Sequence, residues 1–299
     1  MSQADFGPTV RKIILGGMLR QLREAARGGA GIEPAEAASH IKVTVGALSK
    51  IENGRLQRIN PLYVRNLCQL YGVGAQQISE LEETAVQANR RGWWVVYSSV
   101  IPDWFRLFVG LESDASSSNW YEGELIPGLL QTRAYSEALM TVGRRGTNSV
   151  DVDRMVEFRL RRQSRLEGER PIRLHTVINE ATLLRQVGGP AVMADQLRHV
   201  LALMRKPNIT VQVLPFHSGA HGAMTAGFNL LRFDELPGID TVYIETGRSS
   251  NYLATMADVT RYADTFDQLC QSALSPDESA TMIANVAEHH QGQAGKEPI

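Results

Sequence analysis

A short stretch, residues 44–58, carries side chains whose types and spacing suit contact with duplex DNA. If residues 45–53 form a helix, Leu48 and Ile51 face the core of their domain. The side chains left facing outward are Val45, Gly46, Ser49, Lys50 and Asn53. Valine can touch a thymine methyl group, serine can bond to most bases, and lysine reaches guanine or a phosphate. Arg55 and Arg58 follow the helix and suit phosphate oxygens. We interpret the stretch as a base-reading surface, and a helix that only packs is the alternative.

Two short helices joined by a tight corner must position these side chains. The pattern predicts a helix over Glu33–Ile41, a break over Lys42–Thr44 and a second helix over Val45–Asn53. Thr44 is a natural N-cap for the second helix, because its hydroxyl can accept a bond from a free backbone N–H. Such a pair is the helix-turn-helix arrangement, in which the second helix presents its N-terminal half to the major groove.

The surrounding sequence completes a helical domain. An amphipathic pattern begins at Pro8 and ends at the glycine-rich segment 28–31, and further helices are expected over Pro61–Tyr71 and Ala75–Arg90. We therefore predict an all-α, five-helix helix-turn-helix domain over residues 10–91. Residues 1–9 are expected to be a flexible N-terminus.

From Trp93 onward the pattern changes to short β-like runs between helices. Strands are predicted over Ile172–Ile178, Ile209–Pro215, Gly227–Phe233 and Thr241–Glu245. Helices are predicted over Thr132–Val142, Val150–Gly168, Glu180–Val187, Ala191–Arg205 and from a capping box at Ser275 to about Glu288. The fold class is thus multi-domain, with a mixed α/β domain of a small sheet and several helices over residues 92–288. The tail, 289–299, is expected to be disordered.

Composition narrows the function classes. The chain has 299 residues with 43% apolar and 21% charged side chains, typical of a globular protein of two domains. Residues 1–91 hold 12 Lys/Arg against 8 Asp/Glu, so the front is basic while the whole chain carries −1. Two cysteines, Cys68 and Cys270, exclude a disulfide scaffold. No apolar run is long enough to span a bilayer and no signal core opens the chain, so a cytoplasmic location is expected.

Three weaker patterns have plain structural interpretations. His217 and His221 lie four residues apart, but glycines around them predict a loop, so no metal site is expected. His175 and Glu180 have acid–base side chains, yet no nucleophile motif accompanies them, and we expect neither an enzyme nor a cofactor. A third pattern is an arginine run on the helix over 150–168, which we interpret as a solvated face paired in part with Glu157 and Glu167. Its members are Arg159, Arg161, Arg162 and Arg165.

At residues 10–75 the chain resembles Xre-type repressors. The family's second helix usually ends in Ser–x–Ile–Glu–x–Gly, and Ser49–Gly54 reproduces that ending. The stretch GGMLRQLREAA resembles its first helix. The resemblance implies that Val45, Gly46 and Lys50 occupy the positions with which the family reads bases. It also implies that Thr44, Asn53, Arg55 and Arg58 lie near phosphates. The resemblance also implies a structural ion pair between Arg23 and Glu52, although Arg23 lies toward the basic side of its helix.

Two departures from the family's pattern lie at the two ends of the predicted helix Glu33–Ile41. Pro34 stands where the family usually has a backbone-contacting glutamine, so that contact is expected to be absent. Lys42 replaces the usual turn glycine, and lysine resists a left-handed backbone.

The remainder, about residues 100–288, resembles the large C-terminal domain of WhiJ-type regulators of actinobacteria. The similar segments are ELIPGLLQTRAYSEAL, RLRRQSRLEG, VINEATLLRQVGGPAVMADQLRHVL, PNITVQVLPFHSGAH and LSPDESATMI. That group is often encoded beside a small partner protein and is likened to antitoxins.

Our interpretation is a homodimeric, sequence-specific regulator that binds double-stranded DNA. Its C-terminal domain would sense an effector or bind a small protein partner encoded nearby. An antitoxin-like protein that mainly sequesters its partner and autoregulates its own operon is the second hypothesis. A metal-dependent enzyme with a DNA-targeting module is the third.

Overall fold

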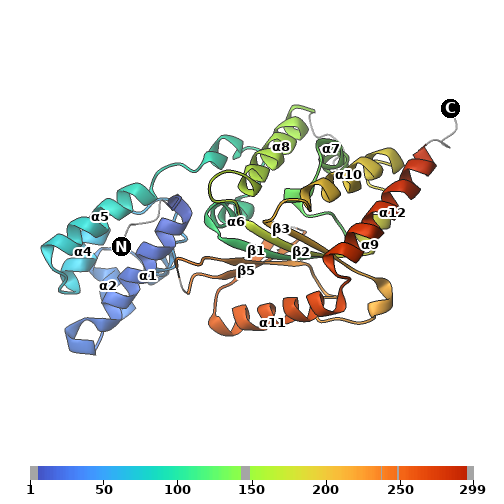
Figure 1. Ribbon diagram of the computed structural model, residues 1–299. Helices are drawn as coiled ribbons and strands as arrows, with labels where there is room; N and C mark the ends of the chain where they lie inside the picture. Colours follow the sequence, from blue (N-terminus) through green and yellow to red (C-terminus); the bar gives the residue numbers. More distant parts are fainter. Residues whose placement is uncertain (1–5, 143–148, 237, 248, 295–299) are drawn as a thin grey trace. The chain divides into compact units, whose positions relative to one another are not determined.

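The computed structural model describes residues 6–142, 149–236, 238–247 and 249–294 (Figure 1). The chain forms two compact units, 1–95 and 96–299. This division falls four residues after the boundary that we placed at 91/92. The order, a helical unit followed by a mixed α/β unit, is the predicted fold class.

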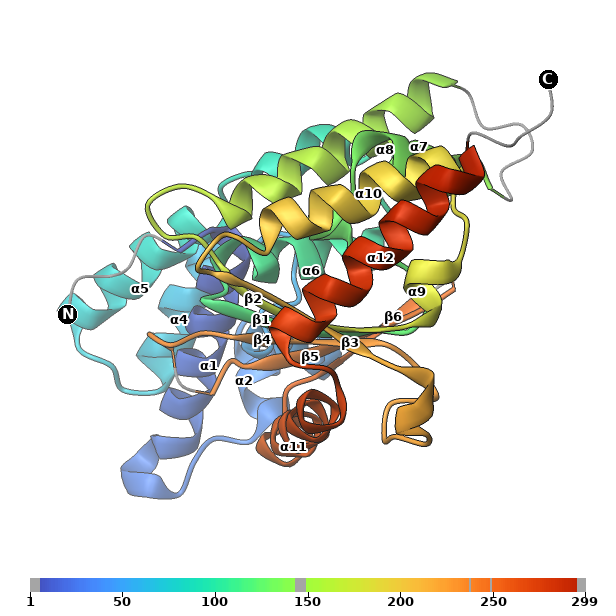
Figure 2. The ribbon, with the colours of Figure 1, turned by 45° about the vertical axis from the view of Figure 1, so that its right-hand side comes forward.

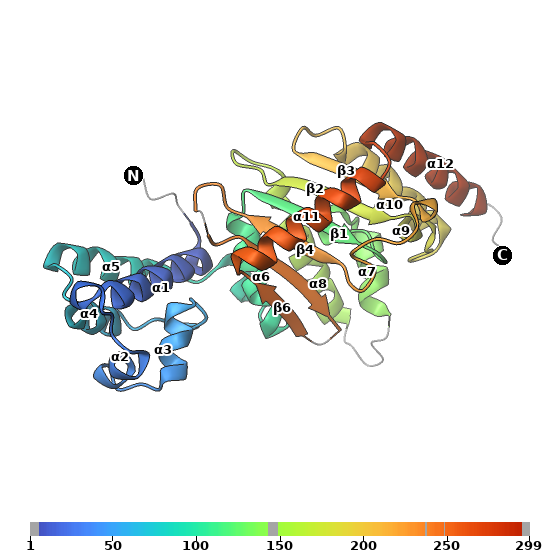
Figure 3. The same ribbon diagram turned by 90° about the horizontal axis from the view of Figure 1, so that it is seen from below.

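The first unit is built from helices around one apolar core. Its α-helices are α1 (Pro8–Ala25), α2 (Pro34–His40), α3 (Val45–Glu52), α4 (Pro61–Leu70) and α5 (Ala75–Ala88). Because α1 begins at Pro8, the expected flexible N-terminus is wrong for residues 8 and 9, and residues 1–5 lie outside the described part. Leu15, Leu19, Leu48 and Ile51 are buried at the centre. Figure 3 shows α2 and α3 side by side.

Two glycines let α1 pack directly on the end of α3. A Cβ on Gly16 would lie 2.6 Å from the carbonyl oxygen of Glu52, closer than such atoms approach one another. Gly54 has φ +63°, and a Cβ there would lie 2.6 Å from the backbone nitrogen of Ile13. Only glycine satisfies the close approach at both positions, so the backbone of α1 fixes where α3 ends.

The second unit contains a mixed sheet. In the described residues its strands are β1 (Ser117–Glu122), β2 (Arg173–Asn179), β3 (Ile209–Leu214), β4 (Phe228–Arg232), β5 (Thr241–Thr246) and β6 (Ser249–Leu253). Their order is β3-β2-β1-β4-β5-β6. β3, β2 and β1 are parallel, whereas β4, β5 and β6 join antiparallel. β1 and β6 were not predicted.

Helices cover both faces of this sheet. One face packs against α11 (Met256–Ser272), and Figures 1 and 2 show α8, α10 and α12 on the other side. The helices besides α11 are α6 (Asp103–Asp114), α7 (Arg133–Thr141), α8 (Ser149–Arg162), α9 (Ala181–Leu184), α10 (Pro190–Leu203) and α12 (Pro276–Ala294). Phe266 of α11 is buried with Tyr121 and Val242 of the sheet, which forms the core on that face.

The C-terminal helix is longer than its sequence pattern indicates. α12 continues to Ala294, and its His290 is buried with Nε2 2.8 Å from the carbonyl oxygen of Leu183. The expected disordered tail is therefore wrong for residues 289–294. Residues 295–299 lie outside the described part.

The arginine run on α8 and beyond is not a solvated face. Arg162 and Glu112 of α6 are buried, and two hydrogen bonds of 2.8 and 2.7 Å join the guanidinium to both carboxylate oxygens. Arg165 donates to the carbonyl oxygens of Glu112 and Ala115, at the end of α6. Of the four arginines, only Arg161 is exposed. Our interpretation of the run was wrong for Arg162 and Arg165, because their side of the chain packs against α6, which supplies their partners.

The Arg162–Glu112 pair lies in apolar surroundings, so removing one partner would leave a buried charge without its counter-charge. The guanidinium lies 5.1 Å from the ring centre of Phe105 and 5.4 Å from that of Phe108. Burial lowers the pKa of Arg162, but the charge and hydrogen bonds of Glu112 outweigh that effect and leave the pKa raised. Arg162 therefore stays charged, and its charge depends on Glu112.

We expect Glu112→Gln to destabilise the chain strongly, because it leaves Arg162 buried without its counter-charge. The free energy of unfolding should fall by about 3–5 kcal/mol. Calorimetric melting of the whole chain measures it. Asp234→Asn, which breaks the exposed pair with Arg173, is the control and should change little. A Glu112→Gln variant as stable as this control would contradict the account.

Candidate functional site

The helix α3 presents the side chains that the sequence assigned to DNA. Thr44 caps it, because the Thr44 hydroxyl oxygen accepts a 3.1 Å hydrogen bond from the backbone N–H of Ala47. Leu48 and Ile51 are each 1% exposed and face the core. All eight predicted contact residues are exposed to solvent: Thr44, Val45, Gly46, Ser49, Lys50, Asn53, Arg55 and Arg58.

Asn53 has a local structural role as well. Its Nδ2 donates to the carbonyl oxygen of Ser49 at 2.8 Å and to the Ser49 hydroxyl oxygen at 3.2 Å. These bonds close the last turn of α3. A phosphate contact from Asn53 Nδ2 must share or replace them, whereas the Ser49 hydroxyl keeps its own proton to donate to a base.

The turn before α3 holds Lys42 in a left-handed backbone conformation, which a lysine side chain disfavours. Lys42 has φ +56°, and the turn closes through Lys42 N to Ser39 O at 3.0 Å and Val43 N to Ala38 O at 2.9 Å. This is the bond pattern with which helices commonly end in a left-handed residue. A non-glycine residue pays about 1–2 kcal/mol for that backbone. The corner is therefore imposed by its packing and hydrogen bonds.

A buried ion pair joins α1 to the end of α3. Arg23 Nε lies 2.7 Å from Glu52 Oε1, Nη2 lies 3.0 Å from Oε2, and both residues are 8% exposed. Arg23 Nη1 also donates to the carbonyl oxygen of Ile32, after the glycine-rich loop. The hydrogen bonds to Glu52 raise the pKa of Arg23. Although Arg23 lies toward the basic side of its helix, it is buried, because the last turn of α1 faces α3.

The cations nearest α3 in the sequence carry uncompensated charge. In the described part of the chain, Lys50, Arg55 and Arg58 have no carboxylate within 4.0 Å, and neither has Lys42 in the turn. Arg27 and Arg65 of the same unit are, in contrast, paired with Glu36 and Glu82. Lys42 was not predicted as a contact residue, and its exposed position beside Thr44 is the signal that could have identified it.

The histidines and the acid–base candidates have separate partners. His221 Nε2 lies 3.2 Å from the Tyr121 hydroxyl, while His175 lies 2.8 Å from Gln212 Oε1 and 3.6 Å from Cys270 Sγ. Burial raises the pKa of Cys270 to about 11, so its thiol is protonated at neutral pH. Across the residues that can be described, no three His, Cys, Asp or Glu side chains converge as metal ligands.

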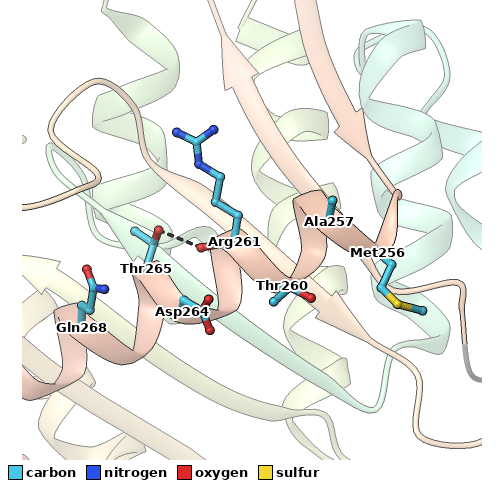
Figure 4. Close-up of a pocket in the computed structure, with 7 residues that line it drawn as sticks. All are labelled: Met256, Ala257, Thr260, Arg261, Asp264, Thr265 and Gln268. Carbon is cyan, nitrogen blue, oxygen red and sulfur yellow. Dashed lines mark hydrogen bonds between the residues drawn. The ribbon is translucent and has the colours of Figure 1, made fainter.

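The outer face of α11 carries a shallow hollow. Figure 4 shows the residues that line it, all on this one helix: Met256, Ala257, Thr260, Arg261, Asp264, Thr265 and Gln268. Arg261 and Asp264 point in different directions, and no second element adds a polar group. The hollow therefore has no converging chemistry.

Comparison with known families places both units. A model described as Helix-turn-helix domain matches residues 14–81, and one described as Domain of unknown function (DUF5753) matches residues 105–285. No curated protein and no solved structure matches the chain significantly. The fold and α3 define a helix-turn-helix DNA-binding protein, and the first match supports a regulator of the Xre type. Because the second match spans more than half of the sequence, the chain belongs to the DUF5753 family.

Within the described residues, no helix has the length and apolar character to cross a membrane.

Removing Arg23 should destabilise the first unit, because Glu52 would stay buried without a counter-charge. We expect Arg23→Ala to lower the free energy of unfolding by about 3–5 kcal/mol. Urea unfolding followed by circular dichroism measures the loss. Arg20→Ala serves as the matched control, since Arg20 lies on the same helix and its pair with Glu24 is exposed. If both variants unfold at the same urea concentration, the pair does not hold α3.

Proposed function

We propose that this protein is a sequence-specific transcriptional regulator whose α3 reads base edges in the major groove. The observation that carries the proposal is the exposed α3, with Lys50, Arg55 and Arg58 beside it, none of which has a carboxylate within 4.0 Å among the described residues. Buried contacts hold the other side of α3 through Leu48, Ile51 and the Arg23–Glu52 pair. A rigid helix with a free polar face is what direct readout requires.

The side chains divide into readers and positioners. Val45 contacts a thymine methyl group, the Ser49 hydroxyl bonds to a base edge, and Lys50 reaches guanine. Gly46 leaves room for the helix to approach the bases. The phosphate-facing set is Thr44, Asn53, Arg55 and Arg58, to which the structure adds Lys42. These contacts set the register of the helix in the groove.

The second unit would carry the regulatory input, as an effector sensor or as the surface for a small protein partner. The resemblance to the WhiJ-type group supports the hypothesis that this unit binds a small protein partner. It therefore also supports the antitoxin-like alternative, in which sequestering that partner is the main role. A hollow between the sheet and the helices α6 and α8 favours a small effector. The proposal places the protein in the cytoplasm and assigns it no catalytic step and no cofactor.

We also propose a homodimer. One recognition helix covers only a few base pairs, and specific binding by such proteins uses two half-sites about one helical turn apart. The core of the first unit uses its apolar side chains internally. We therefore assign dimerisation to the second unit, where residues 92–299 hold an acidic excess that keeps this part off DNA.

Alanine at Lys50, Arg55 and Arg58 together should weaken DNA binding and its salt dependence. Each lost phosphate contact removes roughly one unit from the slope of log affinity against log salt. Mobility shifts on the DNA upstream of the protein's own gene, at several salt concentrations, provide both values. A control variant with alanine at Arg170, Arg173 and Arg198 removes the same charge from the second unit and should bind like the parent. If the first variant has the same affinity and the same slope as the parent, the recognition surface does not include these three side chains.

Separating the units should separate their activities. A fragment of residues 1–95 is expected to be folded, monomeric and weak on DNA, because a single half-site contact is left. A fragment of residues 96–299 should dimerise without binding DNA. Analytical ultracentrifugation gives the mass of each. A dimeric first fragment beside a monomeric second one would reverse the assignment.

A further inference from the structure

A hollow of about 300 Å³ lies within the second unit, between the sheet and the helices α6 and α8. Strands β1, β4 and β5 form its floor, and the loop from Leu125 to Gln131 closes one side. Its volume is at the lower end of the range for small-molecule sites. Unlike the shallow face of α11, this hollow receives polar side chains from several elements.

The first polar group is Arg159 of α8. Its Nη1 donates to Gln131 Oε1, and Gln131 is itself held by Ile126 and Ser136. In the part of the chain that the structure describes, no carboxylate lies within 4.0 Å of this guanidinium. Burial, then repulsion from Arg162, lowers the pKa of Arg159 to about 10, so it is still charged at neutral pH. Among the described residues, the hydrogen-bond partner of this cation is therefore a neutral side chain, that of Gln131.

Two carboxylates line another part of the same hollow. Glu122 accepts hydrogen bonds from the backbone N–H of Glu124 and from the Trp120 indole, and Glu245 accepts one of 3.0 Å from the Tyr243 hydroxyl. Among the described residues, neither carboxylate has a cation within 4.0 Å. Burial raises the pKa of Glu122 to about 7. Both groups are acceptors with room for a donor from a ligand.

A buried amide supplies an independent sign of an absent partner. Asn229 of β4 lines the hollow and is fully buried. Its Oδ1 accepts the Ser118 hydroxyl at 3.0 Å, but its Nδ2 has no hydrogen-bond partner among the described residues. Leaving such a group unpaired costs about 1–3 kcal/mol, and buried amides in folded proteins normally have partners.

The walls of the hollow are aromatic. Phe105, Trp120 and Tyr243 line it, and the rings of Phe105 and Tyr243 meet edge to face with centres 6.2 Å apart. Such walls favour a flat apolar group. Aromatic walls with a few directed polar groups are the usual composition of a small-molecule site.

We propose that this hollow binds a small aromatic zwitterion, such as an aromatic amino acid, with its anionic group on Arg159 and its ammonium group on Glu122 and Glu245. The Arg159 guanidinium is complementary to an anionic group, and the Glu245 carboxylate together with the ionised form of Glu122 is complementary to an ammonium group. The inference rests on the proposed role of the second unit as a sensor, and it names the class of effector.

Three probes that share one phenyl ring test the proposal: L-phenylalanine, 3-phenylpropionate and 2-phenylethylamine. Isothermal titration calorimetry on the full chain should give the tightest binding for phenylalanine, with each single-charge probe at least tenfold weaker. Arg159→Gln should lose at least tenfold for phenylalanine and phenylpropionate, and Glu122→Gln should lose mainly for phenylalanine and the amine. Arg161→Gln, on the same helix but exposed, should bind like the parent.

Binding of none of the probes at 10 mM, or equal binding by the parent and Arg159→Gln, would overturn the proposal. If Arg159→Gln melts early, Arg159→Lys keeps the charge and should bind phenylalanine more weakly than the parent, and equal affinity would again overturn it. Mobility shifts without probe separate this result from the proposed function. If Arg159→Gln binds DNA normally but no longer binds the probe, the ligand site is separate from DNA binding. If the parent chain binds no DNA, the proposed function as a regulator is contradicted.

Discussion

The buried ion pair between Arg23 and Glu52 is the interaction on which the geometry of α3 depends. It ties the last turn of α1 to the last turn of α3, and it fixes the loop after α1 through the carbonyl oxygen of Ile32. A buried charge is tolerated only when it is paired and hydrogen-bonded, so neither residue can change alone. Because Gly16 and Gly54 allow the backbones to touch at the same place, α3 has one position relative to α1. Its outer face is then free for a ligand.

The second unit uses the same physical arrangement for another purpose. Arg162 and Glu112 neutralise each other between α8 and α6, as Arg23 and Glu52 do in the first unit. Arg159, one turn earlier on α8, has no carboxylate within 4.0 Å in the described part of the chain, and it faces the hollow over the sheet. Two arginines on one helix thus differ in their roles because only one of them meets a glutamate. The pairing of Arg162 holds the helix in place, and the helix holds Arg159.

Local patterns predicted the elements that short-range chemistry determines. The Thr44 cap, the apolar positions of Leu48 and Ile51, and the four strands with short β-like runs are all visible in sequence. Strand β1, with the sequence SSNWYE, was missed because it is polar, although it joins the parallel and antiparallel halves of the sheet. Its polar side chains are satisfied across strands, as Ser118 is by Asn229. No local pattern contains that partner.

The same reason explains the errors in burial. An arginine run or the end of a C-terminal helix looks solvated until the element that covers it is known. Glu112 lies 50 residues from Arg162, and Leu183 lies 107 residues from His290. Helices α6 and α11 were not predicted, so the hollow that α6 helps to enclose could not be anticipated. The DNA-facing surface was easier, because its residues lie within one stretch of sequence.

Selection of binding sites from a random pool of duplex DNA tests the central claim, that α3 reads the bases, most directly. The parent chain and Lys50→Gln are selected in parallel, and the enriched sequences are compared position by position. The account predicts an enriched motif of two half-sites about one helical turn apart, which changes at one position in each half-site when Lys50 is replaced. No enriched motif, or an identical motif for both chains, would contradict it.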